Sequence, residues 1–307
     1  MILAQTGRKS KAISKCAIHL TDARHVCYKM LAYPPHTHYA IINKVMRSLL
    51  GILRLAIAFP IVGIGTLLVL AVAWLPIRIR GIRVAPWICT LVARLVMLVF
   101  NVRFHCPKPE RIRQHRGLVF ANHITYFDIL MLLHVLPLRF VSAIEIRSWP
   151  LIGWVARAIG TVFVNRSDKP SRAETRKRIA EAERYPPIVL FPEGGIGPAN
   201  ALRPFRFGAF EIAIEYQIPY LPCAIIYDRP EVVAWGDESF VRAFWRLACT
   251  PGPIHALLVP LTVVIPQPDS KPEPLAIAAH RAIADALRVP PQMSLNAENH
   301  SLRSEAE

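Results

Sequence analysis

The sequence predicts an α/β protein: a mixed, largely buried β-sheet flanked by helices, preceded by a hydrophobic helical membrane anchor. Two observations predict this class. From about residue 104, short β-branched apolar runs alternate with segments of helical pattern, and the runs are apolar throughout, as in strands covered on both faces. Before them, residues 55–77 form a stretch of 23 residues without a charge. The whole chain of 307 residues is long enough for one large domain or two small ones.

Residues 1–45 are predicted to be a basic, disordered tail. They are polar and contain two cysteines and four histidines, namely Cys16, His19, His25, Cys27, His36 and His38. A metal site is the alternative interpretation, but the spacing matches no zinc-binding template. We therefore expect a tail without a metal.

Residues 46–103 are predicted to anchor the protein in a membrane. As a helix, residues 55–77 would be about 35 Å long, enough to cross a hydrocarbon core of about 30 Å. A cleaved signal peptide fits poorly, because the apolar core is too long and no small-residue cleavage site follows it. Pro60, Gly63 and Gly65 could kink this segment or fold it back.

A second apolar stretch, residues 84–100, contains Arg94. It could be a return helix, an interfacial helix whose arginine reaches toward water, or a helix docked on the domain. Basic residues flank both ends of residues 55–77, so the positive-inside rule gives no orientation. We favour a two-segment anchor with both ends, and the following domain, on the cytoplasmic side.

Residues 104–288 are predicted to form the catalytic α/β domain, and residues 289–307 a C-terminal tail. Apolar runs bounded by proline or glycine predict strands at 117–121, 139–143, 161–165, 187–191, 221–226 and 256–265. Helical patterns lie between them at about 127–135, 150–158, 171–184, 207–216 and 273–287. Ser171 and Glu174 resemble a capping box at the start of the third of these helices.

The charge balance favours an anionic partner. There are 37 lysines and arginines against 21 acidic residues, a net charge of +16. Anionic lipid, an anionic substrate and nucleic acid would each attract such a chain. No nucleic-acid-binding motif is present, so we expect an anionic membrane surface and an anionic ligand. The six cysteines form no CxxC pair, which indicates reduced thiols in a cytoplasmic domain.

The stretch NHITYFD at residues 122–128 carries the most specific chemistry. His123 and Asp128 would point about 140° apart on a regular helix. They can meet if His123 lies in the loop after a strand and Asp128 in the first turn of the next helix. A carboxylate that accepts the proton of one imidazole nitrogen makes the other nitrogen a general base. The alternative interpretation is a loop histidine followed by an aspartate that caps the helix.

Two further clusters follow strands. FPEGG at residues 191–195 predicts a loop whose backbone N–H groups could stabilise an oxyanion, although Gly-Gly also marks ordinary turns. Asn165 and Arg166 end the strand at 161–165, and an arginine there suits a phosphate, although it could also be an ordinary surface arginine. GxSxG and glycine-rich nucleotide loops are absent from the sequence, so the base is expected to act directly on a substrate hydroxyl.

Taken together, these blocks resemble the membrane acyltransferase family that acylates lysophospholipids, of the 1-acyl-glycerol-3-phosphate acyltransferase type. NHITYFD matches the family's NHxSxxD block, and GTVFVNRSD at 160–168 matches the block with a terminal arginine. FPEGGIGPANALRPFRFGAF at 191–210 matches the FPEGTxS block, and LPCAI at 221–225 the proline-containing fourth block. The resemblance covers residues 117–226 and implies a glycerolipid acyltransferase fold.

The resemblance implies roles for particular residues. His123 would be the general base and Asp128 the residue that orients it, and both are expected to be catalytic. The residues expected to bind substrate are Asn122, Arg166, Glu193, Gly194 and Gly195. Acyl-CoA or acyl carrier protein would donate the acyl group without a metal or other cofactor. The expected acceptor is 1-acyl-glycerol-3-phosphate, which would become phosphatidic acid; the alternatives are another lysolipid (lysophosphatidylcholine or a lyso-amino-acid lipid) and a non-catalytic lipid-binding homologue.

The chain departs from the family pattern at two positions. Gly195 replaces the usual threonine after the Glu-Gly pair, which removes a hydroxyl from the loop. Ala143, in FVSAIEI, replaces a lysine of the family's FVAKxEL stretch and so removes a phosphate contact. Arg147 and Lys169 are cations that could compensate for it.

Overall fold

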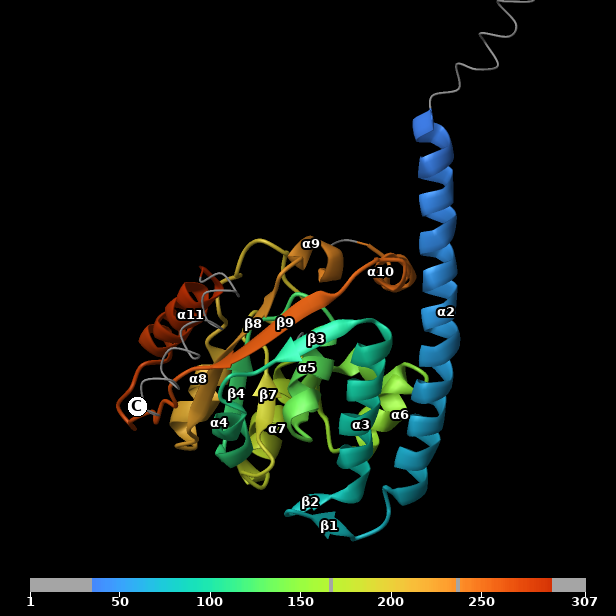
Figure 1. Ribbon diagram of the computed structural model, residues 1–307. Coiled ribbons are helices and arrows are strands. Elements are labelled where there is room, and N and C mark those ends of the chain that lie inside the picture. The colour runs from blue at the N-terminus through green and yellow to red at the C-terminus, as the bar shows by residue number, and fades with distance from the viewer. Residues whose placement is uncertain (1–34, 166–167, 236–237, 289–307) are drawn as a thin grey trace, which may run out of the picture. The chain divides into compact units, whose positions relative to one another are not determined.

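The computed structural model of the chain describes residues 35–165, 168–235 and 238–288 (Figure 1). The predictions for residues 1–34, for Arg166 and for residues 289–307 lie outside the described residues. The chain divides into two compact units between Leu49 and Leu50. The first unit contributes the beginning of helix α2 to the described chain, and the second, which contains all other elements, is described by itself.

Helix α2 runs from Pro35 to Val72 and continues through Pro60. Residues 35–45 are therefore helical, although the sequence predicted them as part of the tail. A proline suits the first turn of a helix because the N–H that it lacks would have no partner there, and the apolar segment that follows contains nothing that stops the helix before Pro60. Among the described helices, α2 is the one that is long and apolar enough to cross a membrane, between Tyr39 and Val72.

A short hairpin, β1 (Arg78–Ile79) and β2 (Ile82–Arg83), leads into helix α3 (Val84–Val99). One face of α3 is buried against α5. Arg94 of α3 donates two hydrogen bonds to the carbonyl oxygen of His134, near the end of α5. Of the three arrangements open for residues 84–100, this packing is that of a helix docked on the domain. Leu91 and Leu98 on α3 remain exposed, so the two-segment anchor stays a prediction.

The second unit contains a seven-stranded sheet in the order β3-β9-β8-β4-β7-β5-β6. All neighbouring strands are parallel except β8 and β9, which are antiparallel, so the prediction of a mixed sheet is confirmed. The strands are β3 (Val102–His105), β4 (Leu118–Ala121), β5 (Arg139–Ala143), β6 (Val162–Val164), β7 (Ile188–Leu190), β8 (Tyr220–Tyr227) and β9 (Ile254–Pro260).

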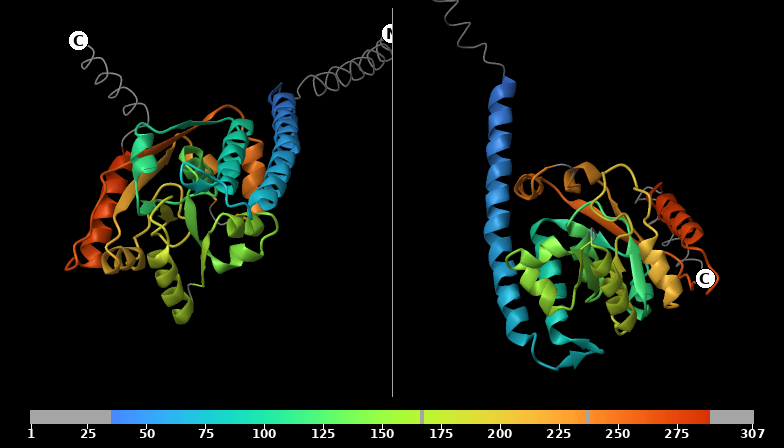
Figure 2. Two further views of the ribbon diagram at one scale, coloured as in Figure 1. Left: turned by 90° about the horizontal axis from the view of Figure 1, so that it is seen from below. Right: turned by 180° about the vertical axis from the view of Figure 1, so that it is seen from behind.

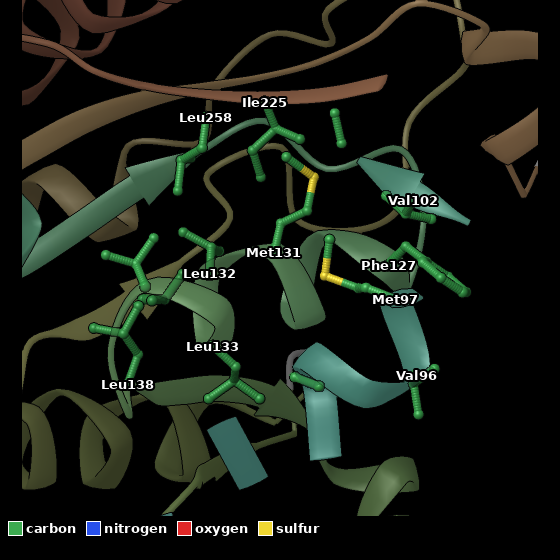
Figure 3. Packing of buried hydrophobic residues seen from close by; sticks show 14 of the residues in the cluster. Val96, Met97, Val102, Phe127, Met131, Leu132, Leu133, Leu138, Ile225 and Leu258 are labelled. Atoms are coloured by element: carbon green, nitrogen blue, oxygen red, sulfur yellow. The ribbon is translucent and has the colours of Figure 1, made fainter. Parts of the chain in front are cut away.

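Helices cover both faces of this sheet, which is why the central strands are apolar on every side chain (Figure 2). The helices beyond α3 are α4 (Pro109–Gln114), α5 (Phe127–Val135), α6 (Ile152–Ala158), α7 (Lys169–Glu181), α8 (Gly208–Glu215), α9 (Pro230–Val233), α10 (Phe240–Ala248) and α11 (Pro272–Arg288), with a 3-10 turn η1 at Ile144–Ser148. Side chains of α3 and α5 pack with alternate residues of β8 and β9 on one face (Figure 3). The other face packs against α7, α8 and α11.

The part of α2 in the second unit contacts the domain at more than one level. Arg54 is buried, and its Nη1 donates to the carbonyl oxygens of Ala248 and Thr250 at 3.0 and 2.7 Å, where α10 ends. A Cβ at Gly51 would lie 2.6 Å from Sγ of Cys249, and one at Gly65 would overlap Val92 of α3. The glycines therefore allow α2 to approach both helices closely.

Three features of the domain differ from the prediction. Strand β3, helices α4, α9 and α10 and the turn η1 were not predicted, because each is short and α10 mixes arginines with aromatic residues. Helix α7 starts at Lys169, and its N-cap is Asp168, whose carboxylate accepts from the N–H of Ser171. The predicted Ser171–Glu174 capping box is therefore wrong: the hydroxyl of Ser171 accepts from the N–H of Asn165, and Glu174 pairs with Arg178.

Candidate active site

The strand order brings two of the predicted clusters together. Strands β8, β4 and β7 are adjacent and parallel, so their carboxyl ends meet at one edge. NHITYFD follows β4, FPEGG follows β7, and Tyr227 ends β8. Strand β6 is at the edge of the sheet, three strand spacings or about 14 Å from β4. Asn165, which directly follows β6, is therefore farther from His123 in the sheet than FPEGG and Tyr227 are.

His123 and Asp128 meet as the sequence predicts. Nδ1 of His123 lies 2.8 Å from Oδ2 of Asp128, with His123 in the loop after β4 and Asp128 in the first turn of α5. Asp128 is fully buried, whereas the side chain of His123 is 10% exposed. The dyad is therefore buried, with only a small part of the imidazole side chain exposed.

The contacts of Asp128 fix the state of the imidazole. Oδ2 also accepts from the backbone N–H groups of Ile124 and Thr125, at 2.8 and 3.0 Å, and Oδ1 accepts from the hydroxyl of Tyr227 at 2.8 Å. Every one of these partners is a donor, so Nδ1 of His123 must donate as well. Nε2 then carries the lone pair, which is the tautomer that a general base requires.

Phe191 holds the ring of His123 from the side. The two ring centroids are 3.9 Å apart and the planes are 15° from parallel. Phe191 directly follows β7, the strand beside β4, so the stacking is a consequence of the strand order. The apolar ring restricts rotation of the imidazole and keeps water away from that face.

Glu193 supports the backbone of the catalytic loop. It is 4% exposed, Oε1 accepts from the N–H of His123 at 2.8 Å, and Oε2 accepts from the N–H of Arg203 at 3.1 Å. Burial raises the pKa of this carboxyl group, and the two backbone hydrogen bonds oppose that shift. Both oxygens thus accept from the backbone, which gives Glu193 a positioning role, and its predicted contact with substrate stays a prediction.

Asn122 has a similar role on the other side. Its amide nitrogen donates to the carbonyl oxygen of Ile225 at 2.9 Å, and its amide oxygen accepts from the N–H of Ile225 at 2.7 Å. The side chain is buried and both of its polar ends bind strand β8. The structure therefore places Asn122 beside the dyad as a link to β8, and its predicted contact with substrate remains a prediction without a described counterpart.

Glycines make the loop after β7 fit around His123. Gly194 has φ +79°, and a Cβ there would lie 2.5 Å from Nε of Arg206. Gly197 donates to the carbonyl oxygen of His123, and a Cβ on it would lie 2.6 Å from Oε2 of Glu193. At Gly195, by contrast, the space around the Cα is open within the described chain. The positive φ favours glycine at 194, a side chain at 197 would displace the Glu193 carboxylate, and the space beside Gly195 is open.

Nearly every backbone group of the catalytic loop is bonded. The carbonyl of His123 accepts from Gly197, the carbonyl of Ile124 from Trp235, and the carbonyl of Thr125 from Asp128. The loop is therefore fixed before any substrate arrives, as a preorganised site requires.

Cationic side chains line two cavities, of which the first shares Phe191 and Gly194 with the site. A cavity of about 410 Å³ between α7 and α8 is bounded by apolar residues, by Phe191 and Gly194, and by Arg172, Arg176 and Arg206. Arg176 also pairs with Glu211. A second cavity of about 400 Å³ is lined by Arg147 and Arg157. Arg147 thus lies on a cavity wall just beyond Ala143, where the sequence predicted a compensating cation.

Tyr227 was missed by the sequence prediction. Its signal was weak: it is the first residue of YDRPE, a stretch at the end of a predicted strand, but no motif names it. Only the pairing of β8 with β4 shows that its hydroxyl reaches Asp128.

Comparisons with known proteins show which family this chain resembles. A family model described as "Acyltransferase" matches residues 103–226. A lyso-ornithine lipid O-acyltransferase of Pseudomonas aeruginosa is 32% identical over 190 residues, which cover 57% of this chain and 71% of that protein. A 1-acyl-sn-glycerol-3-phosphate acyltransferase of Neisseria meningitidis is 27% identical over 160 residues, covering 50% and 63%.

The fold has a solved counterpart. The crystal structure of the 1-acyl-sn-glycerophosphate (LPA) acyltransferase PlsC from Thermotoga maritima matches with a TM-score of 0.63, covering 80% of this chain and 95% of that one at 21% identity. The family model and these relatives show that the chain is an acyltransferase. The chain belongs to the 1-acylglycerol-3-phosphate and lysophospholipid acyltransferase family.

Proposed function

We propose that this protein transfers a fatty acyl group from a thioester donor, acyl-CoA or acyl carrier protein, to the free hydroxyl of a lysolipid. The hydrogen bond between His123 and the buried Asp128 carries the proposal, because it leaves Nε2 of the neutral imidazole free to act as a base. A lipid-binding homologue without activity would gain little from such an oriented base.

The mechanism is direct transfer without a covalent enzyme intermediate. Nε2 of His123 takes the proton of the acceptor hydroxyl, whose oxygen attacks the thioester carbonyl carbon. The tetrahedral intermediate then collapses, the carbon–sulfur bond breaks, and the imidazolium returns the proton to the departing thiolate. No described residue accepts from the N–H groups of Gly195 and Ile196, so they are our candidates for stabilising the oxyanion.

The proposed acceptor is 1-acyl-glycerol-3-phosphate. Support comes from the arginines that line the cavity bounded by Phe191 and Gly194, since guanidinium groups suit phosphate. A lyso-ornithine lipid is the second candidate. It is favoured by the similarity to the Pseudomonas relative and by Ala143, where the related phosphate-lipid enzymes are expected to carry a lysine.

His123→Ala tests the mechanism. Turnover is expected to fall by about 10²–10⁴-fold, the range that a general base contributes, while vesicle binding stays unchanged. Thiol release and mass-spectrometric product analysis with both donors and a panel of lysolipids supply the measurement. His255→Ala is the matched control, because His255 is also paired with an aspartate, Asp228, but is outside the site. Near-wild-type turnover of His123→Ala would refute the role.

The acceptor panel separates the two candidates. Turnover on 1-acyl-glycerol-3-phosphate at least tenfold above that on lyso-ornithine lipid supports the first candidate, and the reverse preference selects the second. We further propose that neither a metal nor another cofactor takes part. Dialysis against EDTA is then expected to leave turnover unchanged, and a loss restored by a divalent cation would contradict this.

We also propose that the protein works at a membrane, with its catalytic domain facing the cytoplasm. Support comes from the apolar side chains that α2 exposes, which include Leu53, Phe59, Ile64 and Leu67. An anionic bilayer would attract the net charge of +16, and the amphiphilic acceptor resides there.

A further inference from the structure

Tyr227 adds a third side chain to the His–Asp pair. It ends strand β8, is 5% exposed, and donates its phenolic hydrogen to Oδ1 of Asp128 at 2.8 Å. Oδ2 of Asp128 already accepts from His123 and from the two loop N–H groups. The hydroxyl is therefore the one described donor to Oδ1.

We propose that Tyr227 is a positioning residue for the acyl-transfer reaction, because its hydroxyl fixes the rotation of the Asp128 carboxylate and limits how strongly that carboxylate attracts the proton on His123. The proposal rests on the proposed function only where turnover is the readout. A donor on Oδ1 withdraws negative charge from the carboxylate, so the imidazolium of His123 is stabilised less than it would be by an unbound carboxylate.

The backbone of β8 explains why this contact is fixed. Ile225 and Tyr227 are two residues apart on one strand and face the same side of the sheet. Ile225 binds Asn122, where the catalytic loop begins, and Tyr227 binds Asp128, where it ends. Strand β8 is itself held between β4 and β9. One strand therefore sets the separation of the loop's two ends.

The phenol remains a donor at any pH at which the protein works. Burial, with the nearby Asp128 charge and its hydrogen bond as smaller causes, raises the pKa of Tyr227 well above its ordinary value. The other titratable groups near the dyad in the described chain are Glu193, from the loop after β7, and Tyr126, whose ring centroid lies 6.5 Å from that of His123.

Tyr227→Phe removes the hydroxyl and keeps the ring. We expect the acid limb of the pH profile of kcat/KM to move up by about half a unit to one unit, because the freed carboxylate stabilises the imidazolium more. The kcat is expected to fall about tenfold, since the carboxylate can rotate, while KM for the lysolipid and the donor changes less than twofold. Tyr220→Phe is the control: Tyr220 is buried on the same strand but faces the opposite side of the sheet.

Incorporation of 3-fluorotyrosine at position 227 gives the opposite change. The fluorinated phenol is a stronger donor with nearly the same shape, so the acid limb is expected to move down. If Tyr227→Phe does not fold, the downward shift of the acid limb in the fluorinated variant still tests the proposal. Because the two substitutions move the limb in opposite directions, a general loosening of the fold cannot imitate both results.

A labelling experiment separates this inference from the proposed function. Ethoxyformylation of His123, followed by peptide mass spectrometry against pH, reports the titration of the imidazole without any acyl transfer. We expect the same opposite shifts in labelling, and labelling shifts without turnover on any lysolipid would leave the role of Tyr227 intact while the proposed function fails. If both substitutions leave the labelling profile and the acid limb within 0.2 unit of the Tyr220→Phe control, the proposal is overturned, because 0.2 unit is only about a 1.6-fold change in the equilibrium constant, against tenfold for a full unit.

Discussion

At the scale of single residues, most of the polar side chains around the dyad bind the protein. The amide nitrogen and oxygen of Asn122 both bind backbone groups, and so do both carboxylate oxygens of Glu193. Asp128 also accepts hydrogen bonds on both oxygens. A buried carboxylate or amide is stable only when it is bonded in this way. Their common effect is to hold His123, of whose imidazole side chain only a small part is exposed.

Glu193→Gln tests this supporting role. A glutamine offers one oxygen and one NH₂ group, so one of the two N–H groups, of His123 or Arg203, loses its acceptor. We expect the free energy of unfolding to fall by about 1–3 kcal/mol, and kcat to fall at least tenfold because the backbone of His123 is released. Urea denaturation and thiol release are the measurements, and the exposed Glu273→Gln is the control.

The pH dependence of that variant follows from the raised pKa of Glu193. A carboxyl group whose pKa is raised by folding holds its proton more tightly in the folded state. The stability of the wild type therefore falls as the pH rises from the ordinary to the raised value. Glutamine does not titrate, so the stability advantage of the wild type over the variant should shrink as the pH rises through this range. An advantage that grows with pH would contradict a raised pKa of Glu193.

At the scale of elements, two sets of contacts stand out: those of the loop after β7 with His123, and those of helix α2 with helix α10. The loop wraps around His123 because Gly194 and Gly197 leave room for Arg206 and Glu193. Arg54 of α2, which is far away in the sequence, donates to the carbonyl oxygens of Ala248 and Thr250 at the end of helix α10. A basic side chain at a helix C-terminus satisfies carbonyls that have no partner within the helix.

Arg54→Leu should therefore loosen α2 and α10. Two carbonyl oxygens lose a charged donor, and we expect the free energy of unfolding to fall by about 1.5–3 kcal/mol. Thermal unfolding in detergent measures the effect. Arg47→Leu removes the same charge from an exposed position on α2 and is expected to be neutral within about 0.5 kcal/mol. Equal melting temperatures for the two variants would show that the Arg54 contact contributes nothing.

At the scale of the whole molecule, the contacts of α2 limit how this helix can lie in a membrane. From Gly51 to Gly65, which is about 21 Å of helix, α2 is close to α10 and α3. The segment from Tyr39 to Leu50, at 12 residues or about 18 Å, is too short to cross a hydrocarbon core of about 30 Å alone. A span by the full helix would draw the domain into the bilayer, so both termini are expected on one side.

Protease protection in sealed vesicles checks this expectation. Tags on the N-terminus and the C-terminus should be cleaved together or protected together, and detergent should expose both in the protected case. Cleavage of one tag with protection of the other would show a single span and would contradict a two-segment anchor. A cytosolic marker enclosed in the same vesicles controls for leakage.

The sequence by itself determined the family, the mixed α/β fold and the His123–Asp128 pair, because these depend on local patterns: apolar runs of strand length, and a loop that turns into a helix within five residues. The tertiary structure alone decided which residues support that pair. Asn122, Glu193 and Tyr227 act through partners between 70 and 103 positions away, and only the strand order β8-β4-β7 makes these segments neighbours. The strand order follows from packing across the whole sheet, which no single stretch of sequence encodes.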